Sequence, residues 1–156
     1  MTVIAWDGRI LASDKQVTMN GTKFSTTKLK YLSNGEYAAM TGDRNDCLAM
    51  LEWYKDGADR DKFPQLGKGN DSYSLLLVIR RNNLSAVYYE SSPFAVNVED
   101  RKIAFGCGRD LALGAMAAGA SAFEAVKIAC QFDIHCGVGC DWVNVANDGV
   151  MRVSDV

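Results

Sequence analysis

The amino-acid sequence predicts an α+β fold in which two packed β-sheets are covered by helices. Short apolar or alternating segments, separated by Asn-Gly and Asp-Gly turns, fill the first third of the chain and return after residue 74. Segments with helical spacing lie in the middle of the chain and late in it. Two groups of strands around such helices are typical of sheets that pack together under helical layers.

Composition predicts one globular domain spanning residues 1–156. A hydrophobic content of 48% gives a chain of 156 residues enough material for a core. Lys and Arg together number 17 and Asp and Glu 19, so the charge balance favours neither a nucleic-acid partner nor an anionic membrane. The apolar runs are too short to span a bilayer and no secretion signal opens the chain, so we expect a cytoplasmic protein.

The first third of the chain is expected to be rich in strands. Its strands are separated by turn dipeptides in which glycine supplies the positive φ of a tight turn. These dipeptides are Asp7-Gly8, Asn20-Gly21 and Asn34-Gly35. The expected strands cover residues 2–6, 9–13, 26–32 and 37–41.

The first predicted helix follows these strands. Asp43 or Asn45 can cap its N-terminus, and Gly57 ends it after about Asp56. Between these limits Cys47, Leu48, Met50, Leu51 and Tyr54 recur at helical spacing. The next segment, residues 57–72, is charged and rich in turn residues, so we expect a surface loop there.

The remaining elements are a hairpin, two helices and a closing pair of strands. Ser121 and Glu124 have the spacing of a capping box, which marks the start of the second of these helices. The other helix follows the Gly106-Cys107-Gly108 segment. The expected strands cover residues 74–80, 85–90, 102–105, 142–145 and 150–153, and the helices run to about Ala118 and Asp133.

Thr2 is the first candidate functional residue. If Met1 is removed, which a small second residue permits, Thr2 carries a hydroxyl nucleophile and a free α-amine that can serve as its base. An unperturbed α-amine has a pKa of about 7.7 to 8.0, and a nearby ammonium would lower it. Such a site requires a lysine beside Thr2 and an acid to hold that lysine. The alternative is that Thr2 simply opens a buried strand with Val3 and Ile4.

The five cysteines raise the question of a metal site. His135, Cys136 and Cys140 lie close together, as ligands of a structural zinc ion would. A closed zinc site needs four ligands, however, and the chain has one histidine and no Cys-x-x-Cys pair. We therefore predict no metal and expect the cysteines to be small buried apolar residues.

Several short motifs occur together in one order along the chain. They are Thr-x-Ile at residues 2–4, Ala12-Ser13-Asp14, Thr27-Lys28-Leu29-x-x-Leu32, Ala38-Ala39-Met40-x-Gly42-Asp43, Ala104-x-Gly106-Cys107-Gly108 and Asp133-x-x-Cys136-Gly137. In this order they resemble the proteasome β-subunit family, particularly the bacterial HslV-type peptidases of the N-terminal-nucleophile hydrolase superfamily. The resemblance runs from Thr2 to about Val145 and implies a four-layer αββα sandwich.

The resemblance also implies roles for individual residues. Thr2 matches the nucleophile, and Lys28 matches the lysine beside it, whose charge would depress the amine pKa. Asp14 matches the acid that pairs with this lysine. Ala39 stands where the family commonly has a glycine whose backbone N–H stabilises the oxyanion. Asp133 matches a supporting aspartate near the nucleophile.

The chain departs from the family pattern at three places. Cys107 and Cys136 stand where the family typically has serines that hydrogen-bond around the threonine amine, and a thiol is a poorer partner than a hydroxyl. The alternative for both cysteines is simple packing. The loop at residues 57–72 stands where the family usually has a second helix. By resemblance, this difference affects the contacts between ring subunits and the docking of a partner ATPase.

The expected function is therefore that of a threonine endopeptidase that hydrolyses peptide bonds through an acyl-enzyme on Thr2. By resemblance it needs no cofactor, acts on unfolded polypeptide or peptides, forms a homo-oligomeric ring and has an ATP-dependent unfoldase as partner. A closed ring would exclude folded proteins by size. The alternatives are a non-catalytic structural or binding subunit of the same fold and an N-terminal hydrolase that acts on a small amide.

Overall fold

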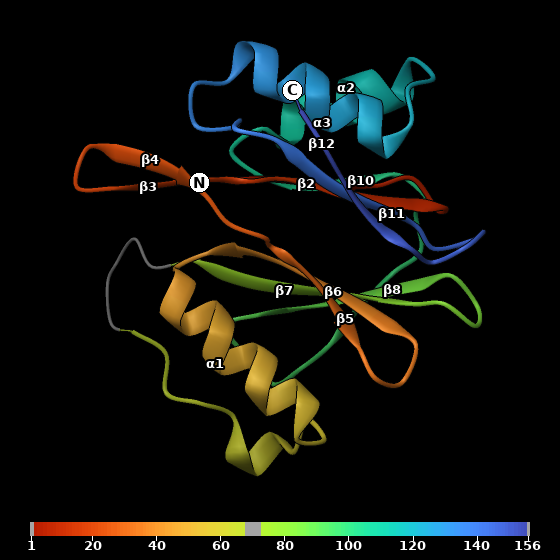
Figure 1. Ribbon diagram of the computed structural model, residues 1–156. Coiled ribbons are helices and arrows are strands. Elements are labelled where there is room, and N and C mark those ends of the chain that lie inside the picture. The colour runs from red at the N-terminus through yellow and green to blue at the C-terminus, as the bar shows by residue number, and fades with distance from the viewer. Residues whose placement is uncertain (1, 68–72, 156) are drawn as a thin grey trace.

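The computed structural model describes residues 2–67 and 73–155 (Figure 1). Within them the strands form two five-stranded antiparallel sheets and one separate hairpin. In the first sheet the order is β10 (Ile103–Gly106), β1 (Val3–Trp6), β2 (Ile10–Asp14), β11 (Cys140–Asn144) and β12 (Met151–Ser154). In the second it is β5 (Leu29–Leu32), β6 (Glu36–Gly42), β7 (Ser74–Arg80), β8 (Ser85–Glu90) and β9 (Val96–Val98). The hairpin pairs β3 (Gln16–Met19) with β4 (Thr22–Ser25).

The two five-stranded sheets pack face to face. Because side chains alternate between the two faces of a strand, Ile4 and Trp6 of β1 lie on one side of the first sheet, and Val3 and Ala5 on the other. Ile4 and Trp6 share an apolar cluster with residues of β6 and β7 in the second sheet. This cluster lies between the sheets and contains Ile4, Trp6, Leu11, Leu29, Tyr37, Ala39, Leu75, Leu77, Ile79, Ala86, Val143 and Val145.

Helices cover the outer face of each sheet. Two helices, α2 (Arg109–Ala117) and α3 (Ala122–Phe132), pack against Val3 and Ala5 of β1 on the first sheet. The helix α1 (Arg44–Lys55) packs against residues of β6 and β7 on the outer face of the second sheet. The layers therefore follow the order helix, sheet, sheet, helix (Figure 1).

Most expected elements are present, and the structure adds two. The hairpin of β3 and β4 was foreseen only as a turn at Asn20-Gly21, and the strand expected over residues 26–32 begins at Leu29. The strand β9 was not predicted. Both additions are mostly exposed, so their sequences show no apolar face from which a strand could be recognised.

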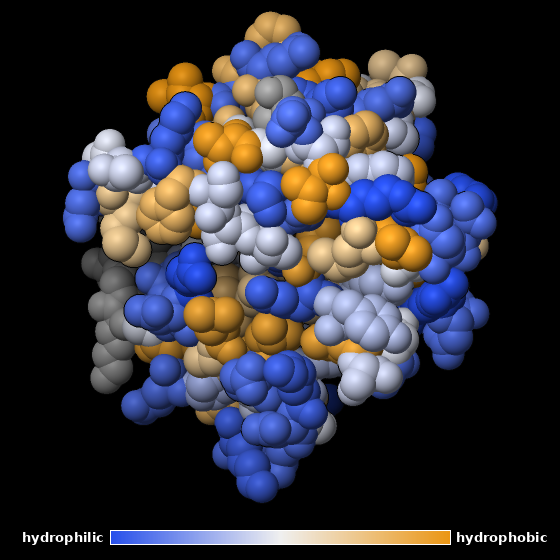
Figure 2. All heavy atoms as spheres, viewed as in Figure 1, coloured by the Kyte–Doolittle hydropathy of each residue, from blue (hydrophilic) through white to orange (hydrophobic). Residues whose placement is uncertain are grey.

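The segment after α1 forms a surface loop, as expected, over the residues that the structure describes. It contains a 3-10 turn, η1 (Arg60–Lys62), and no second α-helix within residues 57–67; residues 68–72 lie outside the described part. Phe63 folds back so that its ring meets Trp53 of α1 edge to face, with ring centroids 4.9 Å apart. The end of the molecule around η1 is hydrophilic in the space-filling view (Figure 2).

The start of α1 is fixed by the backbone before it. Asp43 caps the helix by accepting a hydrogen bond from the Asp46 N–H at 3.0 Å, so Asp43 rather than Asn45 is the cap. Gly42 precedes the cap with φ of +112°, and a Cβ at this position would lie 1.9 Å from the carbonyl oxygen of Tyr73. Only glycine fits this turn from strand into helix.

The capping box of α3 provides a first test of the local structure. The Ser121 hydroxyl accepts from the Glu124 N–H, and the Glu124 carboxylate accepts from the Ser121 N–H. Replacing Ser121→Ala should therefore lower the free energy of unfolding by about 1 kcal/mol, measured by urea denaturation. Ser33→Ala, at an exposed serine that makes no such cap, is the control. Equal effects of the two substitutions would contradict the capping role.

Candidate active site

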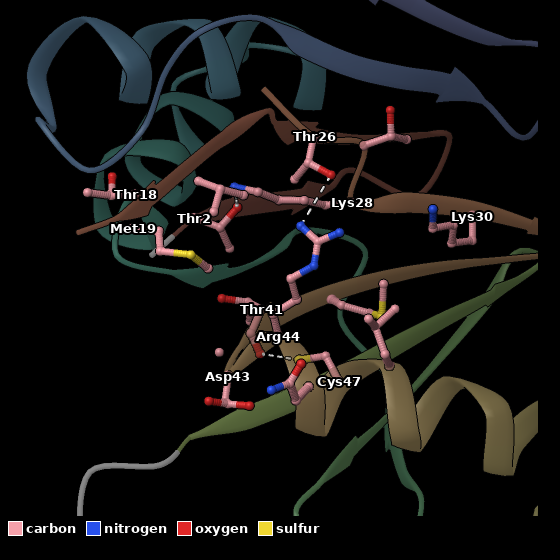
Figure 3. A pocket seen from close by; sticks show the side chains of 16 residues that line it. Thr2, Thr18, Met19, Thr26, Lys28, Lys30, Thr41, Asp43, Arg44 and Cys47 are labelled. Carbon is pink, nitrogen blue, oxygen red and sulfur yellow. Dashed lines mark hydrogen bonds between the residues drawn. The ribbon is translucent and has the colours of Figure 1, made fainter. Parts of the chain in front are cut away.

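Thr2, Asp14 and Lys28 meet in one buried group (Figure 3 shows Thr2 and Lys28). The Lys28 ammonium donates to Asp14 Oδ1 at 2.8 Å and to Thr2 Oγ1 at 2.5 Å. The Thr2 hydroxyl in turn donates to Asp14 Oδ1. The exposed fractions of these residues are 2% for Thr2, 0% for Asp14 and 9% for Lys28, so the group is largely shielded from water.

The fold explains why residues so far apart in sequence come together. Thr2 directly precedes β1, and Asp14 ends β2. The antiparallel register of β1 and β2 pairs Ile4 with Ser13, which brings the start of one strand beside the end of the other. Lys28 directly precedes β5 of the second sheet. Packing of the two sheets therefore places its ammonium beside the start of β1 and the end of β2.

Backbone donors hold the Asp14 carboxylate in place. Asp14 Oδ1 also accepts from the Val3 N–H at 3.0 Å, and Oδ2 accepts from the N–H groups of Gln16 at 3.2 Å and Gly137 at 3.1 Å. Gly137 lies in the loop between α3 and β11, so this contact ties the late part of the chain to the site. A buried carboxylate satisfied on both oxygens keeps a fixed orientation toward Lys28.

Burial sets the electrostatics of Lys28. Removal from water lowers the pKa of the Lys28 ammonium below the ordinary 10.5, while the charge and hydrogen bond of Asp14 act in the opposite direction. Desolvation is the larger effect. Lys28 therefore loses its proton at a lower pH than an exposed lysine does.

A second buried ion pair lies beside the first. The Lys15 ammonium contacts both oxygens of Asp141 at 3.0 and 3.1 Å and the hydroxyl of Thr27 at 3.0 Å. Because Lys15 follows Asp14 and Thr27 precedes Lys28, this pair holds together the two segments that carry the Asp14–Lys28 contact. Sequence reasoning missed it, since no local pattern connects residues 15 and 141.

A pocket of about 380 Å³ opens beside Thr2 (Figure 3). Strand β3, the segment around Lys28, the end of β6 and the start of α1 form its walls. It is lined by Thr2, Val17, Thr18, Met19, Thr26, Thr27, Lys28, Lys30, Met40, Thr41, Gly42, Asp43, Arg44, Asn45, Cys47 and Leu48. The arrangement can hold an extended substrate against the Thr2 hydroxyl.

Ala39 does not lie where the expected oxyanion donor has to be. It is fully buried inside β6, in register with Leu29 of β5 and Leu77 of β7, and belongs to the apolar cluster between the sheets. Asp43 donates its N–H to Tyr73 on the β7 side. Because N–H groups alternate between the two edges of a strand, Ala39 also donates toward β7 and away from the pocket.

The same alternation directs another backbone N–H, at the end of β6, toward the pocket side. The N–H of Gly42 faces the opposite edge from that of Asp43, toward the side on which β5 lies. The pairing of β5 with β6 stops at Leu29 and Ala39, so the Gly42 N–H extends past the end of β5. Gly42 lines the pocket together with Thr2. The direction of the Gly42 N–H follows only from the strand pairing, although Gly42 was part of the sequence motif.

The loop after α3 reaches the site by a different contact from the one expected. The Asp133 carboxylate accepts from the His135 N–H at 2.8 Å within its own loop, and the loop contacts Asp14 through Gly137 instead. Cys136 is buried among apolar residues under α2 and α3, and burial raises the pKa of its thiol. Among the described residues this thiol has no hydrogen-bond partner, which fits packing, and Cys107 is exposed.

The described residues provide neither a metal-binding cluster nor a membrane-spanning helix. Among residues 2–67 and 73–155, no cluster of three or more His, Cys, Asp or Glu side chains is arranged to hold a metal ion. In the same part of the chain, no helix has the length and apolar character needed to cross a bilayer.

The Lys15–Asp141 pair gives a second test. Asp141→Asn leaves the Lys15 ammonium largely buried without a counter-charge, so the free energy of unfolding should fall by about 3 kcal/mol. The matched control is Glu52→Gln, which makes the same chemical change in the exposed Glu52–Lys55 pair and should cost at most about 0.5 kcal/mol. Denaturant unfolding measures both. Similar losses in the two variants would mean that the buried pair has no special role.

Comparison with known proteins agrees with this architecture. Eukaryotic HslV from Trypanosoma brucei is similar in structure, with a TM-score of 0.64 over 91% of this chain and 97% of that chain. The sequences are 19% identical, so the likeness concerns the fold. No protein-family model and no curated protein matches the sequence. The chain therefore has a fold of the proteasome and HslV type.

Proposed function

We propose that the protein is an N-terminal threonine peptidase of the four-layer αββα, N-terminal-nucleophile type, active once Met1 has been removed. The observation that carries this proposal is the buried group of Thr2, Asp14 and Lys28 beside a pocket. It combines a hydroxyl nucleophile with a cation that can stabilise its alkoxide. The HslV-like fold supports the same reading.

Thr2 supplies both nucleophile and base. Its free α-amine takes the proton from Oγ1 as this oxygen attacks the substrate carbonyl carbon and forms a tetrahedral intermediate. The amine then returns the proton to the leaving nitrogen as the peptide bond breaks, which leaves an ester on Thr2. Water, activated by the same amine, hydrolyses the ester and restores the hydroxyl.

Lys28, Asp14 and Gly42 support these steps. The Lys28 ammonium, already hydrogen-bonded to Oγ1, stabilises the developing alkoxide and lowers the pKa of the nearby amine. Asp14 positions Lys28 through the buried ion pair. The Gly42 N–H takes the role of oxyanion donor that the sequence suggested for Ala39, because it faces the pocket side of β6. Asp133 and Cys136 support this arrangement by shaping the loop that carries Gly137.

The proposed assembly and the proposed substrate both follow from the need to protect folded proteins from cleavage. A peptidase with an open cleft would attack other cell proteins, and a homo-oligomeric ring with its sites inside would admit only unfolded polypeptide. We therefore extend the proposal to a cytoplasmic ring, fed by an ATP-dependent unfoldase. No metal or organic cofactor takes part in the proposed steps.

A second candidate is a non-catalytic subunit of the same fold. It is favoured by the two thiols at positions where hydroxyls are expected around the Thr2 amine, since Cys136 packs among apolar side chains and Cys107 is exposed. While the Met1–Thr2 peptide bond remains, Thr2 has no free amine and the proposed base is missing. Removal of Met1 therefore decides between the two candidates.

Mass spectrometry of the intact protein tests the proposal directly. Protein made in cells should lack Met1 and should gain one adduct from an electrophile directed at N-terminal threonines. Thr2→Ala should abolish the adduct and lower peptide turnover by at least about 10³-fold, since the nucleophile is lost. Thr18→Ala is a control, because Thr18 lines the same pocket but is not the proposed nucleophile. An intact Met1 with no adduct would favour the non-catalytic subunit.

The pH dependence of kcat/KM gives a further test. The rate should rise as the Thr2 amine loses its proton, at or below a pH of about 8. It should fall again as Lys28 is deprotonated, and this alkaline limb should lie below pH 10.5 because burial lowers the pKa of Lys28. Lys55→Gln, at an exposed lysine, should leave the profile unchanged. An alkaline limb at or above pH 10.5 would contradict the assigned role of Lys28.

A further inference from the structure

Two cationic side chains of the pocket have no counter-charge among the residues that the structure describes. Lys30 lies on β5 and Arg44 in the first turn of α1. Among the described residues, no carboxylate oxygen lies within ion-pair distance of either side chain. The one hydrogen bond of the Arg44 guanidinium is a long contact of 3.5 Å with the Thr26 hydroxyl. Both cations are therefore available to an incoming ligand.

The carboxylates near the pocket are already engaged by other donors. Asp14 is paired with Lys28 and backbone N–H groups. Asp43 caps α1, and Asp46 is buried and accepts from the Gly67 N–H at 2.9 Å. Among the described residues, none of these acids forms an ion pair with Lys30 or Arg44.

Arg44 is directed into the pocket. In Figure 3 its guanidinium extends from the start of α1 toward Thr26 and Lys28, whereas the Asp43 carboxylate points away from them. The floor of the pocket between α1 and β6 is apolar, with Met40 and Leu48. The pocket thus combines an apolar surface with a cationic rim.

We infer that this pocket selects substrates with a carboxylate side chain, Asp or Glu, at the residue whose carbonyl is attacked. This inference rests on the proposed peptidase function. When the carbonyl carbon lies at Thr2 Oγ1 and its oxygen at the Gly42 N–H, the side chain of that residue lies in the adjoining pocket. Its methylene groups contact Met40 and Leu48, and its carboxylate reaches Arg44 and Lys30.

The physical reason for the selectivity is the charge and shape of the pocket. A guanidinium offers a planar pair of N–H donors that matches both oxygens of a carboxylate. A lysine or arginine side chain in the same place would face two like charges, and an amide side chain would forgo the charge-assisted bonds. Arg44 is therefore a specificity-determining residue, and Lys30 adds to the positive electrostatic potential of the pocket.

The test uses peptides that differ only in the residue before a fluorogenic amide bond, with Glu, Gln, Leu or Lys at that position. The wild-type protein should cleave the Glu peptide at least about tenfold better than the Gln peptide, measured as kcat/KM. Arg44→Gln and Lys30→Gln should each reduce this ratio, with Arg44→Gln removing most of it. Arg44→Glu should shift the preference toward the Lys peptide. Lys55→Gln, which removes an exposed cation at the other end of α1, should leave the ratio unchanged.

The outcomes separate the specificity from the activity on which it depends. Turnover of all peptides at similar rates, or a Glu preference that survives both Arg44→Gln and Lys30→Gln, would overturn the inferred specificity and leave the peptidase in place. Absence of any turnover, together with absence of an adduct on Thr2, would overturn the peptidase itself. A Glu preference lost in Arg44→Gln and kept in Lys55→Gln would support the inference.

Discussion

The buried Asp14 carboxylate is the group on which the rest of the site depends. It has no exposed surface and accepts from the Thr2 hydroxyl, the Lys28 ammonium and three backbone N–H groups, one of them at Gly137. An unpaired carboxylate in this position would be very costly, so the native fold has to bring all of these donors together. Packing of the two sheets therefore completes the site, because it brings Lys28 to Asp14.

The site lies at the boundary between a dry interior and an open pocket. Thr2 and Lys28 are buried, yet both line the pocket, and strand β3 forms a partly exposed wall on its other side. Burial strengthens the interaction between the Lys28 ammonium and the Thr2 hydroxyl, while the pocket keeps the hydroxyl accessible. The unpaired cations Lys30 and Arg44 lie further out, where water still screens them, and they are suited to recognition rather than to chemistry.

Sequence patterns located elements best where burial was strong. Continuous apolar runs identified β1, β6 and β7, because one face of each strand packs against the other sheet and the other face against a helix. The β3–β4 hairpin and β9 lack such a pattern because solvent covers most of their side chains. At the site, motif order was enough to name Thr2, Asp14 and Lys28, which meet in the structure. It could not show that the N–H of Ala39 is directed toward β7, because the direction of an N–H depends on which neighbouring strand it faces.

The sequence by itself determined the local features of this protein: its turns, the capping box of α3, the apolar runs of its buried strands and the reactive groups of Thr2, Asp14 and Lys28. Each depends on residues close in the chain or on a recognisable motif. Only the tertiary structure decided the contacts between distant residues, such as Lys15 with Asp141, Gly137 with Asp14, and Gly42 in place of Ala39 at the pocket. Strand pairing and sheet packing set these contacts, and no local pattern encodes which distant segments will face each other.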